Sequence, residues 1–154
     1  MNTSAIDDIL NPFSWYGGTF ARDELPTAVS SDSSKRFYIV NSDPSTLPGK
    51  HWITLYVGRQ RCEMFDSIGK SPGYYGKDLE YFLVNNSADC KYVYNTARLQ
   101  NYGGDVCGKY GIAYCIHRAA GYSLRQILDM FDINLSRDDA VIENFYDQIV
   151  VNVY

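Results

Sequence analysis

The most constraining feature of the sequence is a pair of strand-like runs joined by a short loop. Residues 51–57 and 62–66 are apolar, strand-like runs, and only residues 58–61 separate them. A loop of that length and chemistry is typical of a β-hairpin. An antiparallel hairpin brings the start of its first strand opposite the end of its second. The sequence therefore predicts that His51 faces Asp66 within side-chain reach.

Helical and strand-like patterns surround this hairpin. An aromatic and β-branched run at 37–40 predicts a central strand, and 90–94 predicts a short edge strand. Helical spacing is expected at 3–10, 77–85, 107–119, 123–131 and 136–150, the last with Ser136 as its N-cap. Turn-rich composition predicts loops at 15–18, 22–26, 30–34, 71–73 and 101–105. The order predicts one α+β domain over residues 1–154, with a central mixed or antiparallel β-sheet flanked by helices.

Charge and hydropathy limit the classes of partner. The 154 residues carry a formal net charge of -4, which does not support nucleic-acid binding through a broad basic surface. A local basic patch at Lys35 and Arg36, or at Arg59 and Arg61, stays open. No apolar run approaches the roughly 18 residues of a membrane span, and the acidic start lacks the layout of a signal peptide. We expect an intracellular protein that is not secreted and has no membrane partner.

Cysteine and histidine spacing gives no support to a metal site. The four cysteines form no CxxC pair, and the two histidines, His51 and His117, lie far apart in the sequence. We therefore expect no metal and no required cofactor.

Cys107 has the setting of a nucleophile. It opens a predicted helix, where the local positive potential favours a thiolate, and a nearby imidazolium would lower its pKa further. Cys115 falls two turns deeper on the same helix and is expected to be a small buried residue. His117 lies ten residues beyond Cys107, about 15 Å along the helix axis, and cannot serve that thiol. His51, oriented by Asp66, is the candidate base.

The local contexts of these residues carry a resemblance to a known family. His51-Trp52, then Phe65-Asp66, then Gln100 seven positions before Cys107 resemble the adenovirus-protease family of cysteine endopeptidases. The likeness extends from about residue 5 to about residue 120. The related ubiquitin-like-protein proteases place the Gln one residue closer to the Cys, so the seven-residue step favours the viral branch.

The resemblance implies a fold and a set of roles. It implies a papain-related fold of the adenain and ubiquitin-like-protease type, with Cys107 as nucleophile, His51 as base and Asp66 as its orienter. Gln100 and the Cys107 backbone N–H would stabilise the oxyanion. Trp52 would roof a narrow channel for Gly-containing substrates; a core-filling role is its alternative. A precursor polypeptide is the implied substrate, matured in the host cell, with the nucleus as one candidate compartment, and in the virion.

Three departures separate this chain from that family. The acid is Asp66 where the adenovirus enzyme has Glu, and it follows a hairpin two residues shorter. The chain is acidic where the adenovirus enzyme is basic, which weakens any inference that DNA activates it. Residues 124–154 have no counterpart that aligns.

Cys90 resembles, one position out of register, a cysteine that bonds to an activating capsid-derived peptide in the adenovirus enzyme. Such a peptide could add a strand at 89–94 and move the Gln100 loop. The alternative is a plain strand residue, since reducing compartments disfavour stable disulfides.

Two other functions remain open from the sequence. One is an isopeptidase that releases ubiquitin-like modifiers, and the other is an inactive binding module of the same fold. The four competent residues at the candidate catalytic positions argue against the inactive module.

Overall fold

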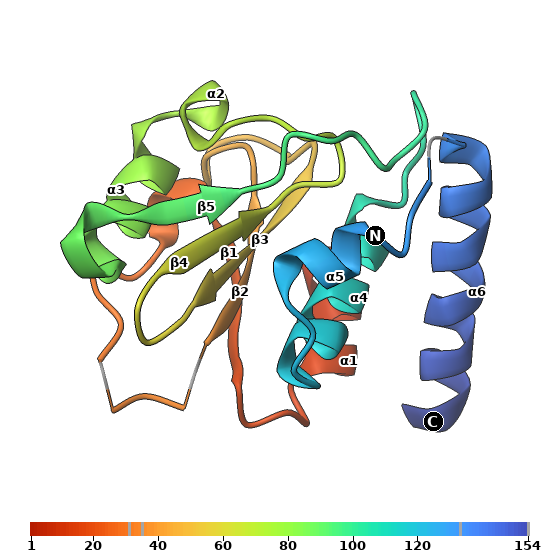
Figure 1. Cartoon of the computed structure of the whole chain (residues 1–154), viewed down its shortest axis with the longest axis horizontal. Helices are drawn as coiled ribbons and strands as arrows, with labels where there is room; N and C mark the ends of the chain where they lie inside the picture. Colours follow the sequence, from red (N-terminus) through yellow and green to blue (C-terminus); the bar gives the residue numbers. More distant parts are fainter. Residues whose placement is uncertain (31, 35, 133, 154) are drawn as a thin grey trace.

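Five strands form one mixed sheet, which the computed structural model places between two groups of helices (Figure 1). The structure describes residues 1–30, 32–34, 36–132 and 134–153. The strands are β1 (Tyr16–Ala21), β2 (Phe37–Asn41), β3 (Trp52–Val57), β4 (Cys62–Phe65) and β5 (Tyr92–Tyr94). They lie in the order of the sequence, with β1/β2 and β4/β5 parallel and the two central pairs antiparallel. The predicted α+β class with a mixed sheet is confirmed.

Helices cover both faces of this sheet. Figure 1 shows α2 and α3 on one side and α1, α4, α5 and α6 on the other. Their bounds are α1 (Thr3–Leu10), α2 (Pro72–Tyr75), α3 (Lys77–Asn86), α4 (Cys107–Ala119), α5 (Leu124–Leu128) and α6 (Leu135–Val153), with 3₁₀ turns η1 (Arg22–Glu24) and η2 (Ala88–Cys90). In the described part of the chain, no helix is long and apolar enough to cross a membrane.

The alternation of side chains along the strands divides the core in two. Phe37 and Ile39 of β2 belong to the core under α4, while Tyr38 and Val40 belong to the core under α3. Because both faces are covered, the strand reads as a continuous apolar run rather than an alternating one. That is why its sequence signal was strong.

The strand β1 corrects the prediction of a loop at 15–18. Its two glycines suggested a turn, yet Tyr16 to Ala21 pairs with β2 across a register shift between Tyr16 and Gly18. A Cβ on Gly17 would lie 2.3 Å from Cε1 of Tyr38. Glycine is therefore needed at this position for the Tyr38 ring to pack against β1. Pairing and packing have overridden local composition here.

Helix ends account for further corrections. Helix α6 begins at Leu135, so Ser136 lies in its first turn and is not its N-cap. The side chain of Asn134 caps it instead, accepting from the Arg137 N–H at 3.2 Å. Helix α5 is shorter than the predicted 123–131, and Ser123 caps it through a capping box with Gln126. The predicted loop at 71–73 is wrong for Pro72 and Gly73, which form the first turn of the short helix α2 after Ser71 at its N-cap.

Candidate active site

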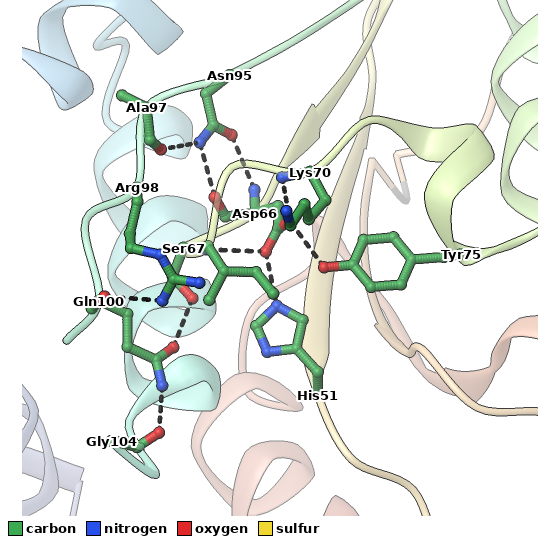
Figure 2. A network of polar contacts seen from close by, with 11 residues as sticks. His51, Asp66, Ser67, Lys70, Tyr75, Asn95, Ala97, Arg98, Gln100 and Gly104 are labelled. Atoms are coloured by element: carbon green, nitrogen blue, oxygen red, sulfur yellow. Dashed lines mark hydrogen bonds and ion pairs between the residues drawn. The ribbon is translucent and has the colours of Figure 1, made fainter. Parts of the chain in front are cut away.

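The ends of the hairpin bring His51 and Asp66 together. His51 directly precedes β3, and Asp66 directly follows β4. The ladder pairs Thr54 with Phe65, so its continuation sets Ile53, not His51, opposite Asp66. The predicted register is therefore wrong by two residues. The predicted contact is nonetheless confirmed, because His51 Nε2 lies 2.6 Å from Asp66 Oδ1 (Figure 2).

The Asp66 carboxylate is fully buried and surrounded by donors. The backbone N–H of Ile68 donates to Oδ1 at 3.0 Å, while the backbone N–H of Lys70 and the hydroxyl of Tyr75 each donate to Oδ2 at 2.8 Å. Burial alone raises the pKa of Asp66, but the hydrogen bond and charge of His51 and these backbone donors outweigh it and hold that pKa below its ordinary value. Asp66 is therefore a fixed anion at neutral pH.

Two residues that the sequence did not single out hold this anion in place. Asn95 accepts from the Asp66 N–H at 2.8 Å and donates from Nδ2 to the Asp66 carbonyl at 2.6 Å. Tyr75, at the end of α2, stacks on the His51 ring with centroids 6.0 Å apart and an interplanar angle of 22°. Figure 2 shows both converging on Asp66 from different segments. The position of Asn95 just after a strand-like run was the one available signal.

Cys107 approaches this pair from the opposite layer. It is the first residue of α4 and is almost fully buried, and His51 lies close enough to lower the pKa of its thiol. Since Nε2 of His51 is bound to Asp66, Nδ1 is the ring nitrogen left for the thiol. The backbone N–H groups of Trp52 and Gly108 also contribute to lowering the pKa of this thiol. Two layers of the fold therefore meet at one thiol.

Glycines in α4 permit this close approach. A Cβ on Gly111 would lie 2.7 Å from Thr54 Oγ1 of β3, and one on Gly108 would lie 3.2 Å from Cδ1 of Trp52. The addition at Gly111 would push the helix away from the sheet, and the addition at Gly108 would crowd the Trp52 ring.

The electrostatics favour a thiolate and imidazolium pair. Burial lowers the pKa of His51, but the hydrogen bonds and charges of Asp66 and Cys107 outweigh burial and raise that pKa to about 9. Burial raises the pKa of Cys107, but His51 and the two backbone donors outweigh it and lower that pKa. The opposed displacements mean that the proton resides on His51, and not on Cys107, over the range of pH between the two pKa values.

Gln100 lies beside this site, held by the residue next to Asp66. The Ser67 hydroxyl donates to Gln100 Oε1 at 2.8 Å, and Gln100 Nε2 donates to the Gly104 carbonyl. The Gln100 N–H also donates to the Ser67 carbonyl at 3.0 Å. An amide nitrogen carries two N–H bonds, so this arrangement occupies one of them. The oxyanion role of Gln100 stays a prediction.

A cleft of about 280 Å³ opens beside Cys107. Trp52 forms part of its wall, buried except for 9% of its surface, and its Nε1 donates to the Met1 carbonyl at 3.0 Å. The other wall residues include Asn41, Pro48, Gly49, Lys50 and Asp105. Trp52 and Cys107 therefore line the same cleft, and the role of Trp52 as the roof of a substrate channel stays a prediction.

Comparison with known proteins gives a limited likeness at the level of structure. No protein-family profile matches the sequence, and no curated protein matches it. Among solved structures, the chain is similar to a selenomethionine crystal structure of the ASFV pS273R protease. The identity is 21% and the TM-score 0.45, over 68% of this chain and 42% of that chain. The chain thus spans about two fifths of that protease, and the function proposed below depends on the site's own geometry.

The remaining candidates lie apart from the thiol. Cys90 ends η2, not a strand, and is exposed with a left-handed backbone (φ 56°); β5 begins two residues later, at the sheet edge as predicted. Its disulfide role stays a prediction. His117 Nδ1 lies 2.8 Å from the Ala113 carbonyl, and Cys115 is fully buried as predicted. Among the described residues, no group of His, Cys, Asp and Glu side chains could hold a metal ion.

Proposed function

We propose that this chain is a cysteine endopeptidase of the adenovirus-protease type, acting on Gly-containing sites in precursor proteins. The observation that carries the proposal is the chain of contacts from Cys107 through His51 to Asp66. The pKa of the thiol is lowered while that of the imidazole is raised to about 9. A buried thiol without that partner would be protonated and inert.

Each residue of this chain of contacts would perform one step. The Cys107 thiolate attacks the carbonyl carbon of the scissile peptide, and the carbonyl oxygen takes the negative charge. The backbone N–H of Cys107, which has no partner within its own helix, and the second N–H of Gln100 Nε2 would donate to that oxyanion. His51 then gives its proton to the leaving amine, and the carbon–nitrogen bond breaks to leave a thioester.

The second half of the reaction regenerates the thiolate. His51, now neutral, takes a proton from a water molecule as that water attacks the thioester carbonyl. The carbon–sulfur bond breaks, the acid product leaves, and the thiolate and imidazolium pair is restored. Asp66 stays ionised throughout and keeps the imidazole in one orientation.

The wall of the cleft supports the choice of substrate. The Trp52 ring is fixed by the hydrogen bond from its Nε1 to the Met1 carbonyl, and it lies close to Gly108 of α4, where a Cβ would stand 3.2 Å from Trp52 Cδ1. A residue with a large side chain would meet this ring, whereas glycine would pass it.

The test combines thiol labelling with peptide cleavage. Iodoacetamide at neutral pH should alkylate Cys107 in the Cys90→Ser variant, which removes the one cysteine classed as exposed. The same variant should cleave short Gly-containing peptides, whereas Cys90→Ser/Cys107→Ser should not. Mass spectrometry locates the label, and chromatography of the peptides locates the cut. Cleavage that survives the loss of Cys107 would refute the proposal.

A further inference from the structure

A concentration of cationic side chains lies around the loop of the β3–β4 hairpin, at the end opposite His51 and Asp66. Arg36, Arg59, Arg61 and Arg118 line one groove of about 620 Å³. They come from the residue before β2, from the hairpin loop and from the end of α4. These four are half of the eight arginines in a chain whose formal net charge is -4. The groove is thus strongly positive on an acidic protein.

The acidic groups around this groove do not balance it. The buried Glu63 carboxylate accepts from Arg118 at 2.9 Å and 3.2 Å and lies 3.6 Å from Arg61 Nε. Asp32 lines the adjoining cavity, which also contacts Arg36 and Arg59. Among the described residues that line the groove, line the adjoining cavity or pair with these arginines, four guanidinium groups face two carboxylates, a formal excess of two positive charges.

The uncharged part of the lining indicates how a ligand would be recognised. Tyr56, Gly58 and Gln60 complete the groove. The Tyr56 ring is already covered by the Arg118 guanidinium, 4.3 Å from its centroid, and packs at 4.9 Å against Phe37. It therefore offers no free face on which a base could stack. Recognition would rest on the guanidinium groups.

We propose that this groove is a binding site for a compact phosphate-bearing anion of the diphosphate or triphosphate class. Planar guanidinium forks match phosphate oxygens in pairs, and closely spaced arginines suit an anion that carries several charges in a small volume. A groove also concentrates the field of its charges on whatever enters it. The site does not depend on the proposed peptidase activity. The hairpin strands, at about 3.3 Å per residue, separate it from His51 by about 20 Å.

The test is a titration with sodium tripolyphosphate, followed by calorimetry at low salt. We expect Arg59→Gln to weaken binding by about tenfold and Arg59→Gln/Arg61→Gln to weaken it further, because each loses a charge-assisted hydrogen bond. Arg125→Gln is the matched control, since Arg125 is exposed on α5 and pairs with Asp129. Circular dichroism melting checks that each variant is folded. Alkylation of Cys107 should be equal in all of them.

Two further ligands test the chemistry of the site. Citrate, which carries carboxylates of similar total charge, should bind at least tenfold more weakly than tripolyphosphate. Adenosine triphosphate should bind about as tightly as tripolyphosphate, because the groove offers no exposed aromatic face on which the adenine base could stack. Backbone amide shifts in an NMR titration should cluster at residues 56–61. Equal binding by citrate, a nucleotide preference above tenfold, shifts elsewhere, or no effect of the arginine variants would each overturn the proposal.

Discussion

At the scale of single residues, Asp66 determines how the candidate site titrates. Its carboxylate raises the pKa of His51, and the protonated His51 in turn lowers the pKa of Cys107. The thiolate is thus present at pH values below the ordinary range of a cysteine, and it is paired with an imidazolium until His51 loses its proton near pH 9. Cys107 and His51 therefore titrate as a coupled pair, and the charge of Asp66 determines the pH range over which both are ionised.

Replacing Asp66 with Asn should therefore shift thiol reactivity to higher pH. Without the anion, the His51 pKa falls, the imidazolium is less available, and the Cys107 pKa rises. The rate of iodoacetamide alkylation, measured from pH 5 to 10 in the Cys90→Ser background, should show a midpoint raised by about one unit or more. Asp129→Asn, an exposed change on α5, is the control. An unchanged midpoint in Asp66→Asn would remove Asp66 from the site.

Tyr75 also positions the Asp66 carboxylate, through a hydrogen bond to its other oxygen atom. Tyr75→Phe keeps the ring that stacks on His51 but loses the hydroxyl that donates to Asp66 at 2.8 Å. We expect kcat for peptide cleavage to fall about tenfold with KM nearly unchanged, because a hydrogen bond to a charged positioning group is lost. Tyr74→Phe, an exposed neighbour, is the control. A change in KM alone would place Tyr75 in substrate binding.

At the scale of elements, the contact between β4 and α4 connects the two halves of the site. Glu63 of β4 is fully buried and accepts from the Tyr114 hydroxyl at 2.7 Å and from Arg118, both of α4. Removing one member of a buried charge pair leaves the other without compensation.

Arg118→Ala should accordingly lower the free energy of unfolding by about 3–5 kcal/mol in urea denaturation. Glu63→Gln should cost less, because an amide can still accept from Arg118 and Tyr114. Neither change should shift the pH midpoint of Cys107 alkylation as Asp66→Asn does. A larger midpoint shift in Glu63→Gln would make Glu63, and not Asp66, the partner of His51.

The seating of α4 on β3 depends on Gly111. Gly111→Ala should destabilise the fold by about 1–3 kcal/mol, because its methyl group would overlap Thr54 Oγ1. The Thr54 hydroxyl is buried and has no hydrogen-bond partner among the described residues. Thr54→Ala should therefore restore much of the stability to the double variant, and denaturation midpoints of the four proteins measure it. The absence of any rescue would show that the helix is limited by another contact.

At the scale of the whole molecule, the parts that the sequence predicted are those set by local pattern. Residues 37–40 and the hairpin were predictable because buried strands are long apolar runs, and Cys107 because it opens a helix. Strand β1 was not, since its glycines are explained only by the Tyr38 ring packed against them. Tyr75 and Asn95 were missed for the same reason, because their partners lie nine and 29 residues away in sequence.

The candidate site combines groups from the sheet with a thiol from α4. The reactivity of the two cysteines in α4 should therefore show whether that helix is packed on the sheet. Cys107 is activated by groups on the sheet, whereas Cys115 in the same helix is fully buried and has a raised pKa. When α4 separates from the sheet, Cys107 should therefore lose its raised reactivity, whereas Cys115 should become accessible to the reagent. In short alkylation pulses at pH 8 across a urea series, label should decline at Cys107 and rise at Cys115 with a shared midpoint, because both thiols reach the same reactivity of an ordinary cysteine once unfolded. Two cysteines eight positions apart would then read the same transition with opposite signs, an internal calibration that needs no added dye.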